Sequence, residues 1–117
     1  MGFNWKKEEI EVKISRLLDS IINLAMVDEV ITPDEESIIE VCRSKLWGLE
    51  HEFLAMTEKN LDVDSARVRI KELFEEVIKS AVDKAKSDGT ITSDELILID
   101  RVTKFLRSTN LEEFIHD

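Results

Sequence analysis

The stretch AMVDEVITPDE at residues 25–35 returns as AKSDGTITSDE at residues 85–95, and this repetition predicts a fold built from two similar halves. Six of the paired positions are identical when residue 25 is aligned with residue 85, an offset of 60 positions. In each copy a threonine is followed three residues later by a glutamate, the pattern of a capping box at the start of a helix. The sequence therefore predicts helices that begin at Pro33 and just after Thr92.

Upstream of each copy, apolar residues recur at steps of three and four, which predicts one long amphipathic helix from Trp5 to Met26 and another from about Ser65. Asn4 is the expected N-cap of the first helix, and Asp62 or Asp64 that of the other. The apolar positions of the first helix are Ile10, Ile14, Leu17, Leu18, Ile21, Ile22 and Ala25, with Glu8, Glu9, Lys13, Arg16 and Asp19 between them.

Downstream, the helix that begins at Pro33 is expected to end near Trp47, because Gly48 is a typical helix stop. A shorter helix is then predicted over 49–58, and a linker over 59–63. The second half is expected to repeat this order, with a medium helix after Thr92 and a last short helix over 109–116.

The ungapped offset extends beyond the turns, since Ile10, Ser20, Ile39 and Leu46 match Ile70, Ser80, Ile99 and Leu106. Neither half has enough surface to bury its own apolar stripe, so the halves should pack face to face. The predicted fold is all-α, one domain over residues 1–117, with about six helices in two pseudo-repeated three-helix units at about 7–58 and 67–117.

The composition argues against nucleic-acid binding and favours cationic partners. The chain has 117 residues with 26 acidic and 16 basic side chains, a formal charge of -10, and 43% hydrophobic residues, so it can bury a core. Proteins gain most of their affinity for nucleic acids from lysine and arginine side chains that neutralise phosphates, so the negative charge of this chain opposes nucleic-acid binding. Basic proteins or metal cations are the better partners.

A single cysteine, Cys42, sits in an apolar helical pattern and is interpreted as a structural thiol in a reducing compartment. Lys13, Arg16 and Asp19 interrupt the most hydrophobic early stretch, so neither a signal peptide nor membrane insertion is predicted. The expected location is the cytoplasm.

Capping explains the threonines and glutamates of both turns, but not Asp28 and Asp88. Each follows a long helix, where the helix dipole disfavours a negative charge. A divalent-cation site is therefore an alternative hypothesis, with Asp28, Asp88, Glu35 and Glu95 as candidate ligands and calcium as the candidate ion. Residues 88–95 fit the second half of an EF-hand loop, but Lys84 and Lys86 stand where that loop needs carboxylates.

The pattern AKSDGTITSDEL at residues 85–96, preceded by a long amphipathic helix and repeated more weakly at 25–36, resembles the tellurite-resistance TerB family. The resemblance runs from about Ile10 to Phe114. It implies an all-helical fold with two pseudo-symmetric halves, acidic positions at Asp28, Glu35, Asp88 and Glu95, and a part in bacterial metal or chemical stress responses. It also implies assembly with partner proteins, some of them in membrane-associated complexes, and it supplies no reaction.

No catalytic pattern is apparent in the sequence. His51 and Glu52 begin like a zinc-protease motif, but Ala55 stands where the second histidine is needed. The large apolar residues Phe3, Trp5, Trp47 and Phe53 are expected in the core, with an exposed partner-binding patch as the alternative. The leading expectation is a non-enzymatic interaction module that binds proteins through acidic surfaces, and the alternative is a divalent-cation binder.

Overall fold

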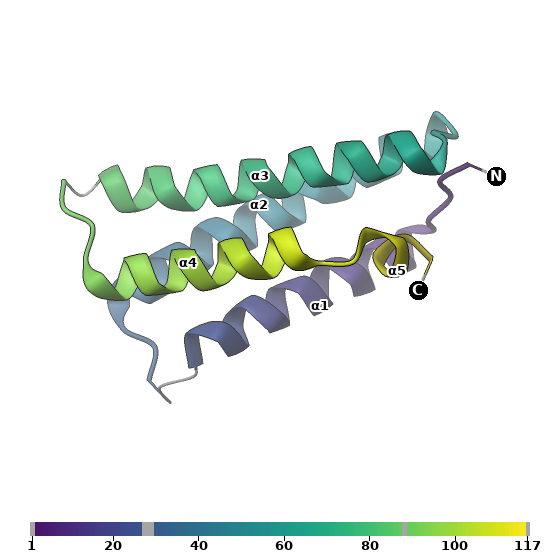
Figure 1. Cartoon of the computed structure of the whole chain (residues 1–117). Coiled ribbons are helices and arrows are strands. Elements are labelled where there is room, and N and C mark those ends of the chain that lie inside the picture. Colours follow the sequence, from purple (N-terminus) through teal and green to yellow (C-terminus); the bar gives the residue numbers. More distant parts are fainter. Residues whose placement is uncertain (1, 27–29, 88, 117) are drawn as a thin grey trace.

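The computed structural model describes residues 2–26, 30–87 and 89–116 and contains five helices in those ranges (Figure 1). Their bounds are α1 Lys7–Ala25, α2 Pro33–Glu58, α3 Val63–Ser87, α4 Ser93–Ser108 and α5 Leu111–His116. Helix α2 packs against α1, α3 and α4, and α5 packs on α3. Apart from an isolated bridge between Gly2 and Asp62, the described ranges contain no β structure. The predicted all-α class is confirmed.

The prediction of about six helices was wrong at Gly48. Helix α2 is continuous from Pro33 to Glu58, so residues 49–58 do not form a separate helix and the first half holds two helices. A glycine inside a helix costs about 1 kcal/mol relative to alanine, whereas burying one large apolar side chain gains about 1.5–3 kcal/mol. The helix has a buried stripe on both sides of the glycine, made by Leu46, Leu49, Phe53 and Met56.

Replacing Gly48 by alanine should stabilise the protein by about 0.5–1 kcal/mol, because alanine lowers the entropy cost of the helix. A Cβ at Gly48 would meet no atom within 4 Å, so no clash offsets this gain. Urea unfolding followed by circular dichroism measures the change. A loss of stability would show that the chain needs glycine there, as it would if α2 were broken at this point.

Two predicted N-caps had different outcomes. Helix α1 begins after Lys6, which makes no side-chain capping bond, so Asn4 is not its cap. Asp62 is confirmed as the cap of α3: the Ser65 N–H donates to Asp62 Oδ2 at 3.0 Å, and the Ser65 hydroxyl donates to Oδ1 at 2.7 Å. These two hydrogen bonds lower the pKa of Asp62 below its usual value.

Burial along α1 matches burial along α3 at the 60-residue offset. Every residue from 10 to 26 is buried, half-buried or exposed in the same way as the residue 60 positions later. The buried residues of α1 are Ile10, Lys13, Ile14, Leu17, Leu18, Ile21 and Ala25. Those of α3 at the offset are Ile70, Leu73, Phe74, Val77, Ile78, Ala81 and Ala85. The two long helices thus use the same face for the core.

An aromatic cluster closes the end of the bundle opposite the two interhelical turns. It is made by Phe3, Trp5, Phe53, Phe74 and Phe114. The indole N–H of Trp5 donates to the Ile115 carbonyl at 3.0 Å, which ties α5 to the N-terminal segment. The cluster confirms Phe3, Trp5 and Phe53 as core residues. The same expectation was wrong for Trp47, which is 37% exposed because it lies outside the buried stripe of α2 that Leu46 and Leu49 form.

Candidate functional site

The two interhelical turns lie at one end of the bundle, where α1 leads to α2 and α3 leads to α4 (Figure 1). In the first turn, Thr32 N–H donates to Glu35 Oε1 at 3.1 Å, and Glu35 N–H donates to Thr32 Oγ1 at 3.2 Å. In the second, Thr92 and Glu95 make the same two bonds at 3.0 and 3.2 Å. Both predicted capping boxes are therefore confirmed.

The glutamates of these boxes lie inside the bundle. Glu35 is 7% exposed and Glu95 is 2% exposed. One oxygen of each carboxylate also accepts the hydroxyl of its threonine, at 3.1 Å in both turns. A buried carboxylate needs such partners, because an unpaired buried charge is costly. The arrangement holds the start of α2 and of α4 in a fixed direction against the core.

The four predicted metal ligands divide into two groups. Glu35 and Glu95 each use one carboxylate oxygen to accept the hydrogen bonds of the capping box. Asp28 and Asp88 lie outside the described residues, so the structure does not place them. Among residues 2–26, 30–87 and 89–115, no group of three or more His, Cys, Asp or Glu side chains could hold a metal ion. The cation site stays a prediction.

Beside the caps, exposed carboxylates gather at the turn end of the bundle. Asp34 and Glu36 are exposed in the first turn of α2, and Asp94 is exposed at the matching place in α4. We define these three side chains as the acidic end. The helix dipole favours negative charge at both helix starts, so the carboxylates are stable there without a ligand.

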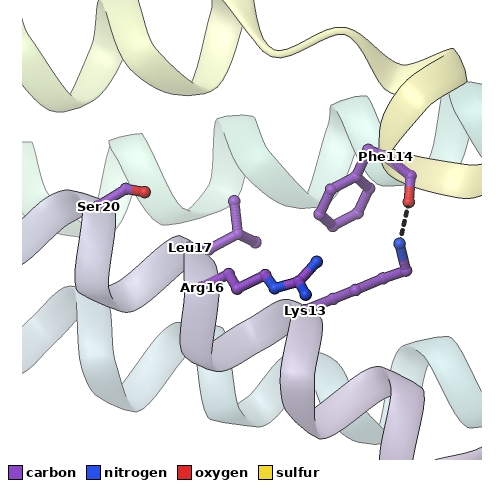
Figure 2. A pocket seen from close by; sticks show the side chains of 5 residues that line it. All are labelled: Lys13, Arg16, Leu17, Ser20 and Phe114. Carbon is purple, nitrogen blue, oxygen red and sulfur yellow. Dashed lines mark hydrogen bonds between the residues drawn. The ribbon is translucent and has the colours of Figure 1, made fainter. Parts of the chain in front are cut away.

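The sequence pattern places Lys13 on the polar face of α1, yet this residue is only 6% exposed. Figure 2 shows its side chain extended toward α5, where Nζ donates a hydrogen bond to the carbonyl of Phe114. The ammonium also lies 4.8 Å from the Trp5 ring centroid and 5.2 Å from that of Phe114. Lys13 therefore links α1 to α5 and the aromatic cluster.

The sequence held a signal for the burial of Lys13, although not for its contact with Phe114. Lys13 sits three residues after Ile10 and one before Ile14, inside the apolar stripe, and the 60-residue offset aligns it with Leu73. A lysine can occupy such a position when its alkyl chain is buried and its ammonium contacts a carbonyl and aromatic rings.

Arg101 of α4 stabilises the end of α1 from another helix. Its Nη1 donates to the carbonyl of Leu24 at 3.1 Å, and the last turn of α1 has no basic residue of its own. A cation at a helix C-terminus is favourable, because it compensates the dipole and uses a carbonyl that lacks a helical donor. No sequence spacing predicts this contact.

Cys42 lies in the core with 0% exposure, as expected of a structural thiol. Burial raises the pKa of its thiol to about 11. At neutral pH the nucleophilic thiolate is therefore scarce, and Cys42 is a poor candidate for covalent chemistry.

Comparison of the chain with models of protein families, with curated proteins and with solved structures finds no match. Within the described ranges, none of the helices combines the length and the hydrophobicity that crossing a membrane requires.

Proposed function

We propose that this chain is a non-enzymatic interaction module of the TerB type, which binds partner proteins with basic surfaces through its acidic end in bacterial tellurite or metal stress responses. The observation that carries the proposal is the pair of capping boxes, each with a buried glutamate and exposed carboxylates beside it. The caps fix the backbone, and the exposed carboxylates are then available to a partner.

The proposed pseudo-repeat of two halves rests on three agreements at the 60-residue offset. The turn sequences match, the buried faces of α1 and α3 coincide, and the helix that follows each turn begins with the same reciprocal Thr–Glu capping box. With α2 continuous, each half is a long helix, a capped turn and a second helix, and the second half adds the short helix α5.

The charge balance supports a basic partner. The chain carries a formal charge of -10, and the acidic end places three exposed carboxylates on two adjacent helix starts. Complementary charge raises association rates and selects partners, more than it raises affinity. Partners with a lysine- or arginine-rich surface therefore fit this end of the bundle.

Neutralising the acidic end should weaken partner capture. The variant Asp34→Asn, Glu36→Gln, Asp94→Asn removes three charges with little change in shape. Capture of proteins from a bacterial extract, quantified by mass spectrometry, should fall by about tenfold for the partners whose binding is sensitive to salt.

The matched control removes the same number of charges elsewhere, from the exposed side of α1, with Glu8→Gln, Glu9→Gln and Glu11→Gln. Its capture should equal that of the wild type. Circular dichroism checks that both variants stay folded. Equal losses in the two variants would contradict the proposal, because they would reflect net charge rather than a defined surface.

Divalent-cation binding by the two turns is the second candidate function. What favours it is the placement of both turns at one end of the bundle, with Asp34 and Asp94 exposed there. In this alternative Asp28, Asp88, Glu35 and Glu95 would be the ligands, and an ion such as calcium would order both turns. The two candidates differ in whether an ion stabilises the protein.

A further inference from the structure

Four large apolar side chains are exposed at the end of the bundle that carries the two interhelical turns. Met26 follows α1 directly, Val30 lies in the turn that leads to α2, and Leu96 and Ile97 lie near the start of α4. Their exposed fractions are 48%, 67%, 54% and 49%, respectively. None of them is among the side chains that form the core or pack against it. We define these four side chains as the apolar corner.

The apolar corner lies where the end of α1 meets the start of α4. Figure 1 shows these two helix ends at the same end of the bundle, and the two helices are in contact. Arg101 of α4 donates to the carbonyl of Leu24 at 3.1 Å. Ile97 precedes Arg101 by one helical turn and lies on the same side of α4, while Met26 follows Leu24 by two residues. Met26 and Ile97 therefore border the same junction.

The 60-residue offset indicates that the bundle does not need apolar side chains at these four places. Each has a polar counterpart in the other half, and in the same order these are Lys86, Thr90, Glu36 and Ser37. The buried faces of α1 and α3 agree at this offset, so the two halves differ here in what they expose. An exposed apolar cluster that does not support the core is typical of a surface that another molecule covers.

Unpaired carboxylates border the apolar corner. Asp94 precedes Ile97 by three residues, so the two side chains are neighbours on the surface of α4. Asp34 and Glu36, the other two carboxylates of the acidic end, lie on the adjacent start of α2. None of the three forms an ion pair with another residue that the structure describes.

The cations of α4 near this surface already have partners. Arg101 is half-buried on the Leu24 carbonyl, and Lys104 Nζ lies 3.0 Å from Asp100 Oδ2. The last turn of α1 has no basic residue. The unpaired carboxylates of the acidic end therefore leave negative charge beside the apolar corner, and this charge favours a cationic partner.

From these features we infer that the partner of the acidic end docks through a basic amphipathic segment. Apolar side chains of that segment cover the apolar corner, and its lysines or arginines face Asp94, Asp34 and Glu36. This inference rests on the proposed function and adds the kind of segment that the partner presents. Charge attracts many basic surfaces to an acidic protein, whereas an apolar contact beside the carboxylates selects segments that carry both kinds of side chain.

The test uses a short fluorescein-labelled peptide with leucines on one helical face and lysines elsewhere, and a matched peptide of equal charge with serine at every leucine. Fluorescence anisotropy should show that the full-length protein binds the leucine peptide about tenfold more tightly than the serine peptide. The double variant Leu96→Ser, Ile97→Ser should lose this preference, because it weakens binding of the leucine peptide about tenfold and leaves binding of the serine peptide unchanged.

The matched control is the double variant Val12→Ser, Val68→Ser, which changes two exposed apolar side chains of α1 and α3 outside the apolar corner. It should bind both peptides as the wild type does, and circular dichroism checks that both double variants stay folded. Equal binding of the two peptides by the wild type would overturn the inference. So would an equal loss in the two double variants, or failure of the wild type to bind the leucine peptide.

The variant that neutralises the acidic end separates this inference from the proposed function. It should weaken binding of both peptides, because both carry the same positive charge. If it did so while the wild type bound the two peptides equally, the apolar contact would be refuted and the acidic end would stand. If it bound both peptides as the wild type does, the acidic end itself would be refuted as the binding surface.

Discussion

The Phe53→Ala variant should lose about 3–5 kcal/mol of its free energy of unfolding, the usual cost of removing a buried aromatic ring. Phe53 is 0% exposed. Its ring centroid lies 5.1 Å from that of Trp5 and 6.5 Å from those of Phe3 and Phe114. The substitution would thus open a cavity where the N-terminal segment, α2 and α5 meet. Urea unfolding followed by circular dichroism measures the loss.

The neighbouring substitution Leu54→Ala is the control, because Leu54 is only half-buried at the edge of the core and should cost much less. Since the indole of Trp5 faces Phe53, its fluorescence should also change in Phe53→Ala. If Phe53→Ala cost no more than Leu54→Ala, the aromatic cluster would not be a packed part of the core.

Glu95→Ala should cost about 1–2 kcal/mol, the second largest effect expected. The carboxylate is 2% exposed and accepts from both the backbone N–H and the hydroxyl of Thr92, so its loss leaves a partly buried donor unpaired. Thr92→Ala should cost about 1 kcal/mol, because it removes the acceptor for Glu95 N–H. Chemical denaturation of both single variants measures these losses.

The double variant Thr92→Ala, Glu95→Ala shows whether the pair acts as a unit. Its loss should be smaller than the sum of the single losses, since each substitution already breaks the reciprocal bonds. The matched pair Thr32 and Glu35, with the same geometry, should behave alike. Additive losses in both turns would mean that the two partners stabilise the protein independently.

Much of the fold could be predicted from local patterns. Periodic apolar residues located α1 and α3, and the Thr–Glu spacing located the starts of α2 and α4. The end of α2 could not be predicted from local patterns. Gly48 is a local stop signal, because glycine costs a helix about 1 kcal/mol relative to alanine. The buried side chains on both sides of Gly48 pack against α1 and α3, and this packing outweighs that cost.

The candidate sites depended more on tertiary structure. The capping glutamates were found from spacing, although their burial was not. Arg101 reaches a carbonyl 77 residues away, and Lys13 reaches one 101 residues away, so neither contact has a local signal. Arg107 likewise pairs with Glu75, which lies 32 residues earlier, so no local pattern predicts that contact.

We infer that the two Thr–Glu capping boxes, rather than bound ions, order the acidic turns. The most direct test is the melting temperature of the wild type and of Asp88→Asn, each measured with calcium and with a chelator. The claim predicts the same melting temperature in both conditions for each protein. An ion at a hundred times its dissociation constant would instead add about 2.7 kcal/mol to the wild type. A calcium-dependent rise that disappears in Asp88→Asn would contradict the claim and favour the cation-binding alternative.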